Sequence, residues 1–527
     1  MQVGLSRVRW GGVWRNQDFL KLWAGETVSL FGSQITTLAL PLTAVQSFAA
    51  TPAQMGILSA ARFLPFLLLT LVAGVWVDVY RRRPILVGAN LGRAFVLALV
   101  PLGAVMGWLR MWHLYAVAFG VGALTVLFDL AYQSYVPSLV EREELVEANS
   151  KLQTSASAAE VGGPALGGLL VEWLSAPVAV AADALSFLVS AVLLGAIHRP
   201  EPRMDAPAQR VPLFRQIGEG LRITFSNPYL RSLAGEAATY NFFETAILAL
   251  FTLYATRELG LSPAQLGTVM GTGAVGTLLG ALMAERAARG LGLGRAILAS
   301  MTLACVAPLL IPLVRGPLPV VIALLVVAFF VNGVGLAMSN VHVVSLRQAV
   351  TAPHLLGRMN GSYRFFVYGA IPLGSLFGGL LGEHLGVRST LLVAAGGLCA
   401  ALLWVVSSPV PRLRRLPEQA GPASGWDPGG RPFDPLQVDR ASPRPLVAGT
   451  QRRRGPPPVA AQDRPFPGRH RNGIQGHQAV GKEGTPWPTP SIPVMSTTAG
   501  TTASSPCWRS NPARRWSSRW SMRQAGS

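Results

Sequence analysis

The chain has 527 residues, of which 50% are hydrophobic and only 13% are charged. Soluble domains usually carry about 25% charged residues, so this composition excludes an ordinary soluble globular protein. The formal net charge of +20 would suggest nucleic acid in a soluble protein, but the basic residues here lie mainly at the ends of apolar segments and in the tail. Membrane orientation and anionic lipid account for that placement. Membrane lipid, and not nucleic acid, is therefore the expected partner.

Apolar segments of about 18 or more residues with few charges are long enough to cross a bilayer as helices. Six are predicted at 20–46, 54–77, 84–107, 112–136, 153–172 and 176–197. A proline-rich link follows, with a short amphipathic helix expected at the membrane surface. Six more are predicted at 230–254, 264–285, 293–314, 318–343, 362–381 and 387–409. We therefore expect an all-α membrane protein of twelve transmembrane helices, with an N-terminal half (1–198), a cytoplasmic linker (199–228) and a C-terminal half (229–415).

The segment 416–527 differs in composition from everything before it. Proline, glycine, arginine and serine dominate, and no apolar periodicity remains. Such a chain cannot bury enough apolar surface to offset its ordering entropy, so a disordered tail is predicted. It is either a basic tail that binds lipid or a segment without selected structure, and the second interpretation is favoured.

The two predicted halves share an internal repeat. The segment Pro52-Ala53-Gln54-Met55-Gly56 returns as Pro263-Ala264-Gln265-Leu266-Gly267, an offset of 211 residues between positions 52 and 263. The same offset relates other identical residues, namely Asn16 and Asn227, Asn149 and Asn360, and the glycine pairs at 167–168 and 378–379. A chain built twice from one membrane-embedded unit is typical of transporters that bind substrate between the halves.

Arginine and lysine alternate between the loops in a way that predicts orientation. Alternate loops hold basic clusters, such as those at 81–83, 203–222, 286–295 and 412–415. The loops on the opposite side hold at most one each, Arg110, Arg257, Arg315 and Arg388. Cationic loops stay on the cytoplasmic side during insertion, so both termini are expected in the cytoplasm. The predicted location is the cytoplasmic (inner) membrane of a bacterium, crossed many times.

Gly74, Asp78 and three arginines at 81–83 lie around the loop between the second and third predicted spans. This pattern resembles the signature of the major facilitator superfamily at that loop, in the variant of drug exporters such as macrolide efflux proteins and the enterobactin exporter. Val79 departs from it, since a basic residue is usual there. The resemblance covers about residues 15–410.

The resemblance implies a major facilitator fold and a conformational latch between the halves. Gly74, Asp78, Arg82 and Arg83 would form this latch and stabilise the outward-facing state. A carboxylate beside the N-terminus of a neighbouring helix is stabilised by the helix dipole, which gives Asp78 a physical role. The alternative is that the arginines only set membrane orientation.

Ionisable side chains inside spans are costly and are usually functional or paired. Arg93 and Asp129 lie at similar depths on consecutive predicted spans, so an intramembrane ion pair is expected, with Arg82 as a competing partner for Asp129. Five further carboxylates have no obvious local cationic partner and are candidates for proton coupling: Glu26, Glu160, Asp183, Glu236 and Glu244. Burial disfavours the charged form of a carboxylate, which lets it carry a proton. A hydrogen bond to a neighbouring helix, without titration, is the alternative for each.

Small residues and prolines interrupt two predicted spans. Gly163, Pro164, Gly167 and Gly168 lie in the fifth, and Pro372 lies in the eleventh. The first group resembles the Gly-Pro motif of superfamily antiporters, although Ala159 replaces one of its glycines. A hinge and close helix packing are both consistent with these residues. Aromatic residues that could line a substrate cavity, or only pack, are Phe128, Phe242, Phe243, Phe365 and Phe366.

The absence of a phosphate-binding glycine loop argues against ATP as the energy source, and no enzyme motif appears. Cys305, Cys399 and Cys507 have no paired spacing, so neither a metal site nor a cofactor is expected. We expect a monomeric secondary transporter, not an enzyme, that exports lipophilic or amphipathic molecules in exchange for protons. The alternatives are an importer or uniporter of a small polar solute and a membrane sensor that does not transport.

Overall fold

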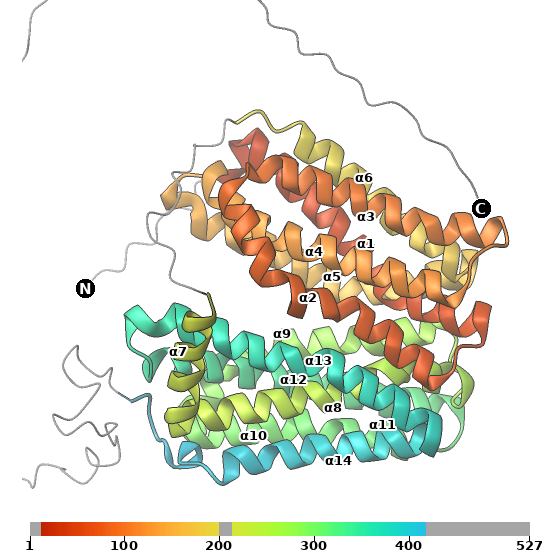
Figure 1. Cartoon of the computed structure of the whole chain (residues 1–527). Helices are drawn as coiled ribbons and strands as arrows, with labels where there is room; N and C mark the ends of the chain where they lie inside the picture. The colour runs from red at the N-terminus through yellow and green to blue at the C-terminus, as the bar shows by residue number, and fades with distance from the viewer. Residues whose placement is uncertain (1–11, 200–212, 418–527) are drawn as a thin grey trace, which may run out of the picture. The chain divides into compact units, whose positions relative to one another are not determined.

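The computed structural model describes residues 12–199 and 213–417, although a few side chains inside these ranges, that of Asp78 among them, are outside the description. The predicted tail therefore lies outside the described residues from 418 onward. Within the described ranges the chain forms helices and no strands (Figure 1). The N-terminal half consists of α1 (Gln17–Phe48), α2 (Pro52–Val79), α3 (Arg82–Val105), α4 (Met111–Leu139), α5 (Leu145–Leu174) and α6 (Ala176–Gly195). After α7 (Leu213–Ser226), the C-terminal half consists of α8 (Pro228–Arg257), α9 (Pro263–Leu291), α10 (Leu293–Val306), α11 (Leu310–Leu313), α12 (Leu318–Ala349), α13 (Leu356–Leu385) and α14 (Val387–Val406).

If α10 and α11 are counted as one interrupted span, the described part of the chain has twelve long helical segments, six in each half. Ten of them are long and apolar enough to cross a membrane. The other two, α5 and α8, are also 30 residues long but carry Glu160, Glu236 and Glu244 among other polar residues. The predicted architecture, an all-α membrane protein of twelve helices in two six-helix repeats, is confirmed.

The repeat holds for secondary structure as well as for sequence. The 211-residue offset carries the 3-10 turn η2 (Arg142–Glu144), α5 and α6 onto η4 (Pro353–Leu355), α13 and α14 residue for residue. The helix starts also correspond. Asn16 and Asn227 cap α1 and α8 by accepting hydrogen bonds from backbone N–H groups of the first turn, which would otherwise lack partners. Thr51 and Ser262 form capping boxes at the starts of α2 and α9.

Several helix boundaries differ from those predicted. α9 ends at Leu291 rather than 285, and α12 ends at Ala349 rather than 343. α5 begins at Leu145 rather than 153, and α13 begins at Leu356 rather than 362. Hydropathy detects only the part of a helix that matches the hydrocarbon core, whereas the helix itself continues through polar residues beyond it. The predicted span at 293–314 is interrupted, because Pro308 lies in a 3-10 turn (Ala307–Leu309) between α10 and α11. Proline lacks the N–H that an α-helix would use there.

We call the end of the helix bundle that holds the α1–α2 and α8–α9 connections the far end, at residues 49–51 and 258–262. The opposite end, which holds Asn16 and Ser407, is the terminal end (Figure 1). The halves contact each other mainly through α2 with α13 and through α5 with α9. α7 packs on α13 and α8. There Arg358 Nη1 and Glu219 Oε2 form an ion pair at 2.8 Å, and Phe225 meets Phe366 edge to face.

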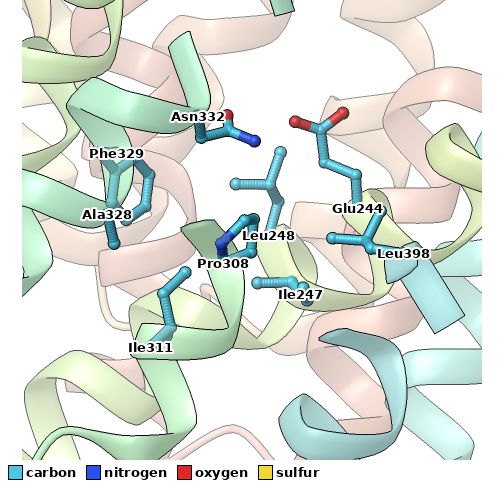
Figure 2. Close-up of a pocket in the computed structure, with 9 residues that line it drawn as sticks. All are labelled: Glu244, Ile247, Leu248, Pro308, Ile311, Ala328, Phe329, Asn332 and Leu398. Atoms are coloured by element: carbon cyan, nitrogen blue, oxygen red, sulfur yellow. The ribbon is translucent and has the colours of Figure 1, made fainter. Parts of the chain in front are cut away.

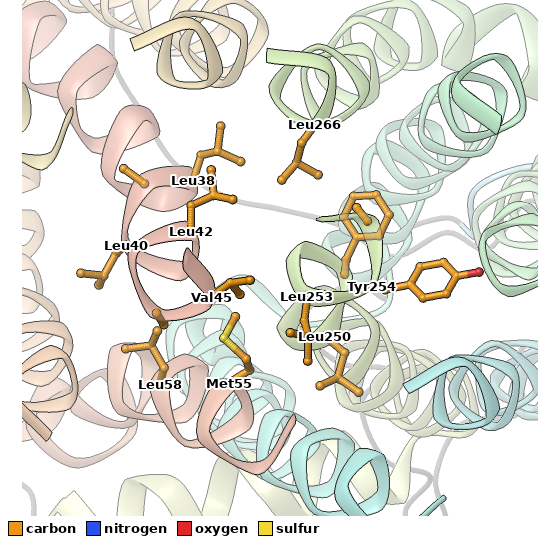
Figure 3. Packing of buried hydrophobic residues seen from close by; sticks show 14 of the residues in the cluster. Leu38, Leu40, Leu42, Val45, Met55, Leu58, Leu250, Leu253, Tyr254 and Leu266 are labelled. Carbon is orange, nitrogen blue, oxygen red and sulfur yellow. The ribbon is translucent and has the colours of Figure 1, made fainter. Parts of the chain in front are cut away.

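The largest apolar core joins the two halves near the far end (Figure 3). Leu38, Leu42 and Met55 of the N-terminal half belong to the same buried cluster as Leu250 and Leu266 of the C-terminal half. Each of these five side chains is at most 2% exposed. The far end is therefore closed in this structure by close-packed side chains from both halves.

Candidate functional site

A cavity of about 620 Å³ lies between the halves. Its walls come from the second part of α2, the second part of α4 and the first part of α13. These are the parts of the three helices that lie nearer the terminal end. Aromatic and aliphatic side chains make up most of the lining, and the polar side chains in it include Asp129, Gln133 and Arg364. The volume is that of a typical small-molecule site with a few polar groups on an apolar wall.

The far end lacks room for such a cavity because backbone meets backbone there. A Cβ on Gly168 of α5 would lie 2.3 Å from the Pro263 carbonyl oxygen, and a Cβ on Gly379 of α13 would lie 2.7 Å from the Gly56 Cα. Under the repeat, the counterpart of the first contact is the approach of the same Gly379 Cβ to the Pro52 carbonyl oxygen, at 3.0 Å. The pentapeptides that begin at Pro52 and Pro263 therefore form the pseudo-symmetric contact between the halves.

The predicted hinge residues occupy packed positions. A Cβ on Gly163 would lie 2.4 Å from the Gln34 Cβ, and one on Gly167 would lie 3.0 Å from the Ile35 Cα, so these glycines let α5 approach α1. Pro164 is buried next to Gly267 of α9, and Pro372 is buried in α13. Close packing thus has direct structural support, and the hinge stays a prediction.

Arg93 is the centre of a buried polar cluster in the N-terminal half. Its side chain is 4% exposed and its guanidinium carbon lies 4.2 Å from the ring centre of Phe128 and 4.1 Å from that of Phe187. The guanidinium also donates to Asn90, which in turn donates to Ser190 Oγ at 2.8 Å. Arg93 is thus held between two aromatic rings, a geometry in which a desolvated cation is stabilised.

Three carboxylates interact electrostatically with Arg93: Glu26 on α1, Asp129 on α4 and Asp183 on α6. The charges of Arg93 and Asp129 interact, but no direct ion pair joins the two side chains in the described part of the chain, so the expected pair stays a prediction. The aromatic rings hold the guanidinium, which serves three acids at longer range. Glu26 and Asp183 therefore have a cationic neighbour that their positions in the sequence did not reveal. Asp129 also lines the cavity, so it connects the cluster with the space between the halves.

Arg62 on α2 is a further cation that the sequence analysis did not single out. It donates to Thr37 Oγ1 at 2.8 Å and interacts electrostatically with Asp183. Asp183 is 1% exposed and accepts a hydrogen bond from Ser186 Oγ at 3.1 Å. An arginine inside a predicted apolar span is itself a signal of a buried partner, and that rule would have found Arg62.

A second polar cluster lies inside the C-terminal half. Tyr240 Oη donates to Glu244 Oε1 at 3.0 Å, and Asn332 Nδ2 donates to Tyr240 Oη at 2.9 Å. Glu244 and Asn332 also line a small pocket of about 30 Å³ among apolar side chains (Figure 2). Tyr240 was missed, although the spacing of four between it and Glu244 puts both on one helix face.

The remaining predicted carboxylates have different surroundings. Glu236 is 7% exposed, and no hydrogen bond or ion pair to it is found among the described residues. It lies near enough to Glu244 for the two charges to interact. Glu160 is exposed. Of these two carboxylates Glu236 is the buried one, and proton coupling stays a prediction for both.

The predicted latch residues lie at the terminal end. Arg83 donates from Nε to the Leu194 carbonyl oxygen at 3.2 Å and also reaches the Gly195 carbonyl, so it caps the C-terminus of α6 within its own half. Arg82 is half-buried at the start of α3. Gly74 has open space around it, since a Cβ there would meet no atom within 4 Å. The side chain of Asp78 is outside the described residues.

Most of the predicted aromatic residues pack and do not line the cavity. Phe365 lines it, together with Phe63, Phe66 and Tyr368, which were not predicted. Phe128 instead stacks on Arg93. The others contact neighbouring rings, with Phe242 and Phe243 packed on Phe377 and Phe366 on Phe225.

Comparisons with known proteins agree with this geometry. The profile of a family described as transmembrane secretion effectors matches residues 12–426. The multidrug efflux pump Tap of Mycolicibacterium fortuitum is 30% identical over 397 residues, which are 73% of this chain and 93% of that protein. Tap of Mycobacterium tuberculosis is 30% identical over 424 residues, 76% of this chain and 95% of that protein. Macrolide efflux protein A of Streptococcus pyogenes is 24% identical over 265 residues, 50% of this chain and 65% of that protein.

Solved structures share the fold at low sequence identity. A bacterial homologue of the human lysosomal transporter Spinster superposes with a TM-score of 0.61 at 16% identity, covering 78% of this chain and 100% of that one. A bacterial homologue of the iron transporter ferroportin superposes with a TM-score of 0.60 at 20% identity, covering 75% of this chain and 99% of that one.

Proposed function

Because the chain belongs to the transmembrane secretion effector family of major facilitator transporters, we propose that it exports lipophilic or amphipathic small molecules in exchange for protons. Transport proceeds by alternating access, with the cavity between the halves as the substrate site. The protein acts as a monomer in the cytoplasmic membrane of a bacterium, with both termini in the cytoplasm. The location of Asp129, which belongs both to the cavity wall and to the buried cluster around Arg93, carries this proposal.

The cavity wall supports the substrate class. Phe63, Phe66, Phe365 and Tyr368 offer rings to a flat apolar body, while Asp129 offers a carboxylate to a cationic group. Aromatic faces and one charge suit an amphipathic molecule better than a strongly hydrated one. The pumps named above are described as multidrug and macrolide exporters, which agrees with such substrates.

The distribution of basic residues supports the direction of transport. The arginine-rich loops lie at the terminal end, which therefore faces the cytoplasm. The cavity walls run toward that end while the far end is closed. This conformation suits loading from the cytoplasm or the inner leaflet, as an exporter requires.

Proton coupling follows from competition within the Arg93 cluster. The Arg93 guanidinium compensates three carboxylates only in part, and Arg62 adds a second cation beside Asp183, so at least one of Glu26, Asp129 and Asp183 is disposed to hold a proton. A cationic substrate beside Asp129 favours loss of that proton, and its release lets a proton return. One proton moving across about 100 mV supplies about 2.3 kcal/mol, enough for a concentration ratio of about 45.

The latch is proposed to act in the outward-facing state, in which the halves close at the terminal end. Gly74 has no packing role in this conformation, which agrees with a glycine needed only when the halves close at the terminal end. Asp78, Arg82 and Arg83 would then stabilise the outward-facing state by helix-terminus and ion-pair contacts. Pro164 and Pro372 are proposed to let α5 and α13 bend during the exchange.

The test uses inverted membrane vesicles with an imposed proton gradient and a hydrophobic cationic dye. Dye uptake should depend on the gradient, and Glu26→Gln, Asp129→Asn and Glu244→Gln should each reduce it. Glu160→Gln, at an exposed position, is the matched control and should transport normally. Uptake that persists with a protonophore would refute proton coupling, and absence of dye uptake under every condition would refute the substrate class.

A second candidate function has one observation in its favour. Gln133 and Arg364 add polar groups to the cavity wall, as a site for a small polar solute would need. An importer or uniporter of such a solute would show uptake into intact cells, independent of the proton gradient for a uniporter. A sensor that does not transport would show neither activity.

A further inference from the structure

Two glutamates at the far end each reach from one half to the other. Glu172 of α5 accepts through Oε2 from Ser262 Oγ at 2.9 Å and from the Ala264 backbone N–H at 3.1 Å, at the start of α9. Glu383 of α13 accepts through Oε2 from the Ala53 backbone N–H at 3.1 Å, at the start of α2. Each carboxylate therefore caps the N-terminus of a helix in the other half.

The two contacts are copies of one another. The 211-residue offset carries Glu172 onto Glu383 and Ala53 onto Ala264. The first N–H groups of a helix lack intrahelical partners and carry the positive end of the helix dipole, so a carboxylate there is stabilised. A contact that was kept, with the same chemistry, in both copies of the repeat is not an accident of side-chain placement.

These caps exist only while the far end is closed. Gly168 and Gly379, about one turn before the two glutamates, make the backbone contacts that bring α5 to α9 and α13 to α2. Opening the far end separates those helices and moves the helix starts away from the carboxylates. Water must then replace hydrogen bonds that the other half supplied.

We propose that Glu172 and Glu383 are paired gate residues that stabilise the closed far end and so set the balance between the two access states. They act opposite to the latch at Gly74 and Asp78, with the same carboxylate-to-helix chemistry at the other end of the bundle. The proposed orientation decides only which side of the membrane the far end faces, and the gate role rests on it in no other way. It is independent of the substrate and of proton coupling.

Both glutamates are exposed, so water and salt screen each cap. Removing one carboxylate charge should therefore shift the ratio of far-end-closed to far-end-open molecules by about twofold to fivefold. The two contacts lie on different helix pairs and share no partner. Their effects should multiply, giving about fourfold to 25-fold in the double variant.

The experiment measures access to two reporter cysteines in full-length protein from which Cys305, Cys399 and Cys507 have been removed. Met55→Cys reports on the far end, because Met55 is 2% exposed in the core between the halves. Gln133→Cys reports on the cavity. A membrane-impermeant maleimide is applied to intact cells and, separately, to inverted vesicles, so each end is probed from a known side.

In Glu172→Gln with Glu383→Gln, labelling at Met55→Cys from outside should rise while labelling at Gln133→Cys from inside falls. The matched control is Glu258→Gln, an exposed glutamate at the same end, for which no contact with the other half is found in the described part of the chain; it should change neither rate. An unchanged Met55→Cys rate would overturn the proposal. So would a rise at both reporters, since that pattern means general loosening. Labelling of each reporter only from the opposite side would refute the orientation and leave the gate intact.

Discussion

Adding one methyl group at Gly267 should shift the protein away from the conformation seen here. A Cβ on Gly267 of α9 would lie 2.1 Å from the Pro164 carbonyl oxygen and 2.9 Å from the Pro164 carbonyl carbon, both backbone atoms of the other half. Backbone cannot rotate away as a side chain can. Ordinary contact begins near 3.4 Å, so Gly267→Ala must separate α5 from α9 locally by about 1 Å.

The cost applies to only one of the two access states. Overpacking by a methyl group destabilises a packed contact by about 1–3 kcal/mol, which is about a fivefold to 150-fold change in an equilibrium constant. Opening the far end separates α5 from α9 and removes that cost. Gly267→Ala should therefore populate molecules with the far end open and the terminal end closed.

Distances between spin labels measure this shift in purified protein. One pair reports on the far end, at the exposed residues Trp173 and Glu258, and another reports on the terminal end, at Val146 and Leu291. Gly267→Ala should lengthen the first distance and shorten the second. An unchanged pair of distance distributions in a folded protein would refute the view that backbone contact at the far end holds this conformation.

Gly74→Ala is the matched comparison. A Cβ at Gly74 meets nothing within 4 Å, so the conformation seen here should tolerate the substitution. If Gly74 is needed for the terminal end to close, this variant should keep the terminal-end pair long under all conditions. A shift in the same direction as that of Gly267→Ala would contradict the latch.

Three further predictions concern the Arg93 cluster, the hydrogen bond between Asn332 and Tyr240, and removal of the tail. Arg93→Met leaves Glu26 and Asp129 without their cation, and it should destabilise the protein by about 3–5 kcal/mol, seen as a lower melting temperature in detergent. Adding Asp129→Asn should recover part of the loss, and no recovery would refute the electrostatic coupling. Asn332→Leu removes the donor to Tyr240 and should lower proton-driven uptake while the fold persists, which circular dichroism and vesicle uptake measure together. A chain that ends at residue 416 should insert and transport normally. A chain that ends at residue 408 also loses the Leu413 carbonyl, which accepts a hydrogen bond from the Gly294 N–H at 2.8 Å. The melting temperature should therefore fall for the shorter chain and not for the longer one.

Local signals in the sequence were enough for the helices and their order. The apolar segments and the repeated pentapeptides act within a few residues of chain. The asparagines at 16 and 227 were noticed only as repeated residues, and the structure shows that they cap α1 and α8. The signals for helix ends were weaker, because hydropathy reports the hydrocarbon core and not the helix. The early starts of α5 and α13 escaped prediction for that reason.

The sequence was a poorer guide to which charged side chains interact with one another. Arg93 and Asp129 were expected to pair because they lie at similar depths, but depth along a helix does not determine which way a side chain points. The fold instead sets Arg93 between Phe128 and Phe187. Glu26 of α1 and Asp183 of α6 interact with it electrostatically. α6 packs on both α1 and α3, although it is far from them in the chain.

The sequence by itself determined that this is a membrane protein of two related halves, because hydrophobic length and repetition are properties of the chain. It also marked nearly every buried charge, since an ionisable residue in an apolar segment is conspicuous without coordinates. Only the tertiary structure decided which charges meet and which end is closed. It also showed that Glu172 and Glu383 cap helices across the interface. Those features depend on the approach of backbone segments distant in sequence, and no local pattern encodes that distance.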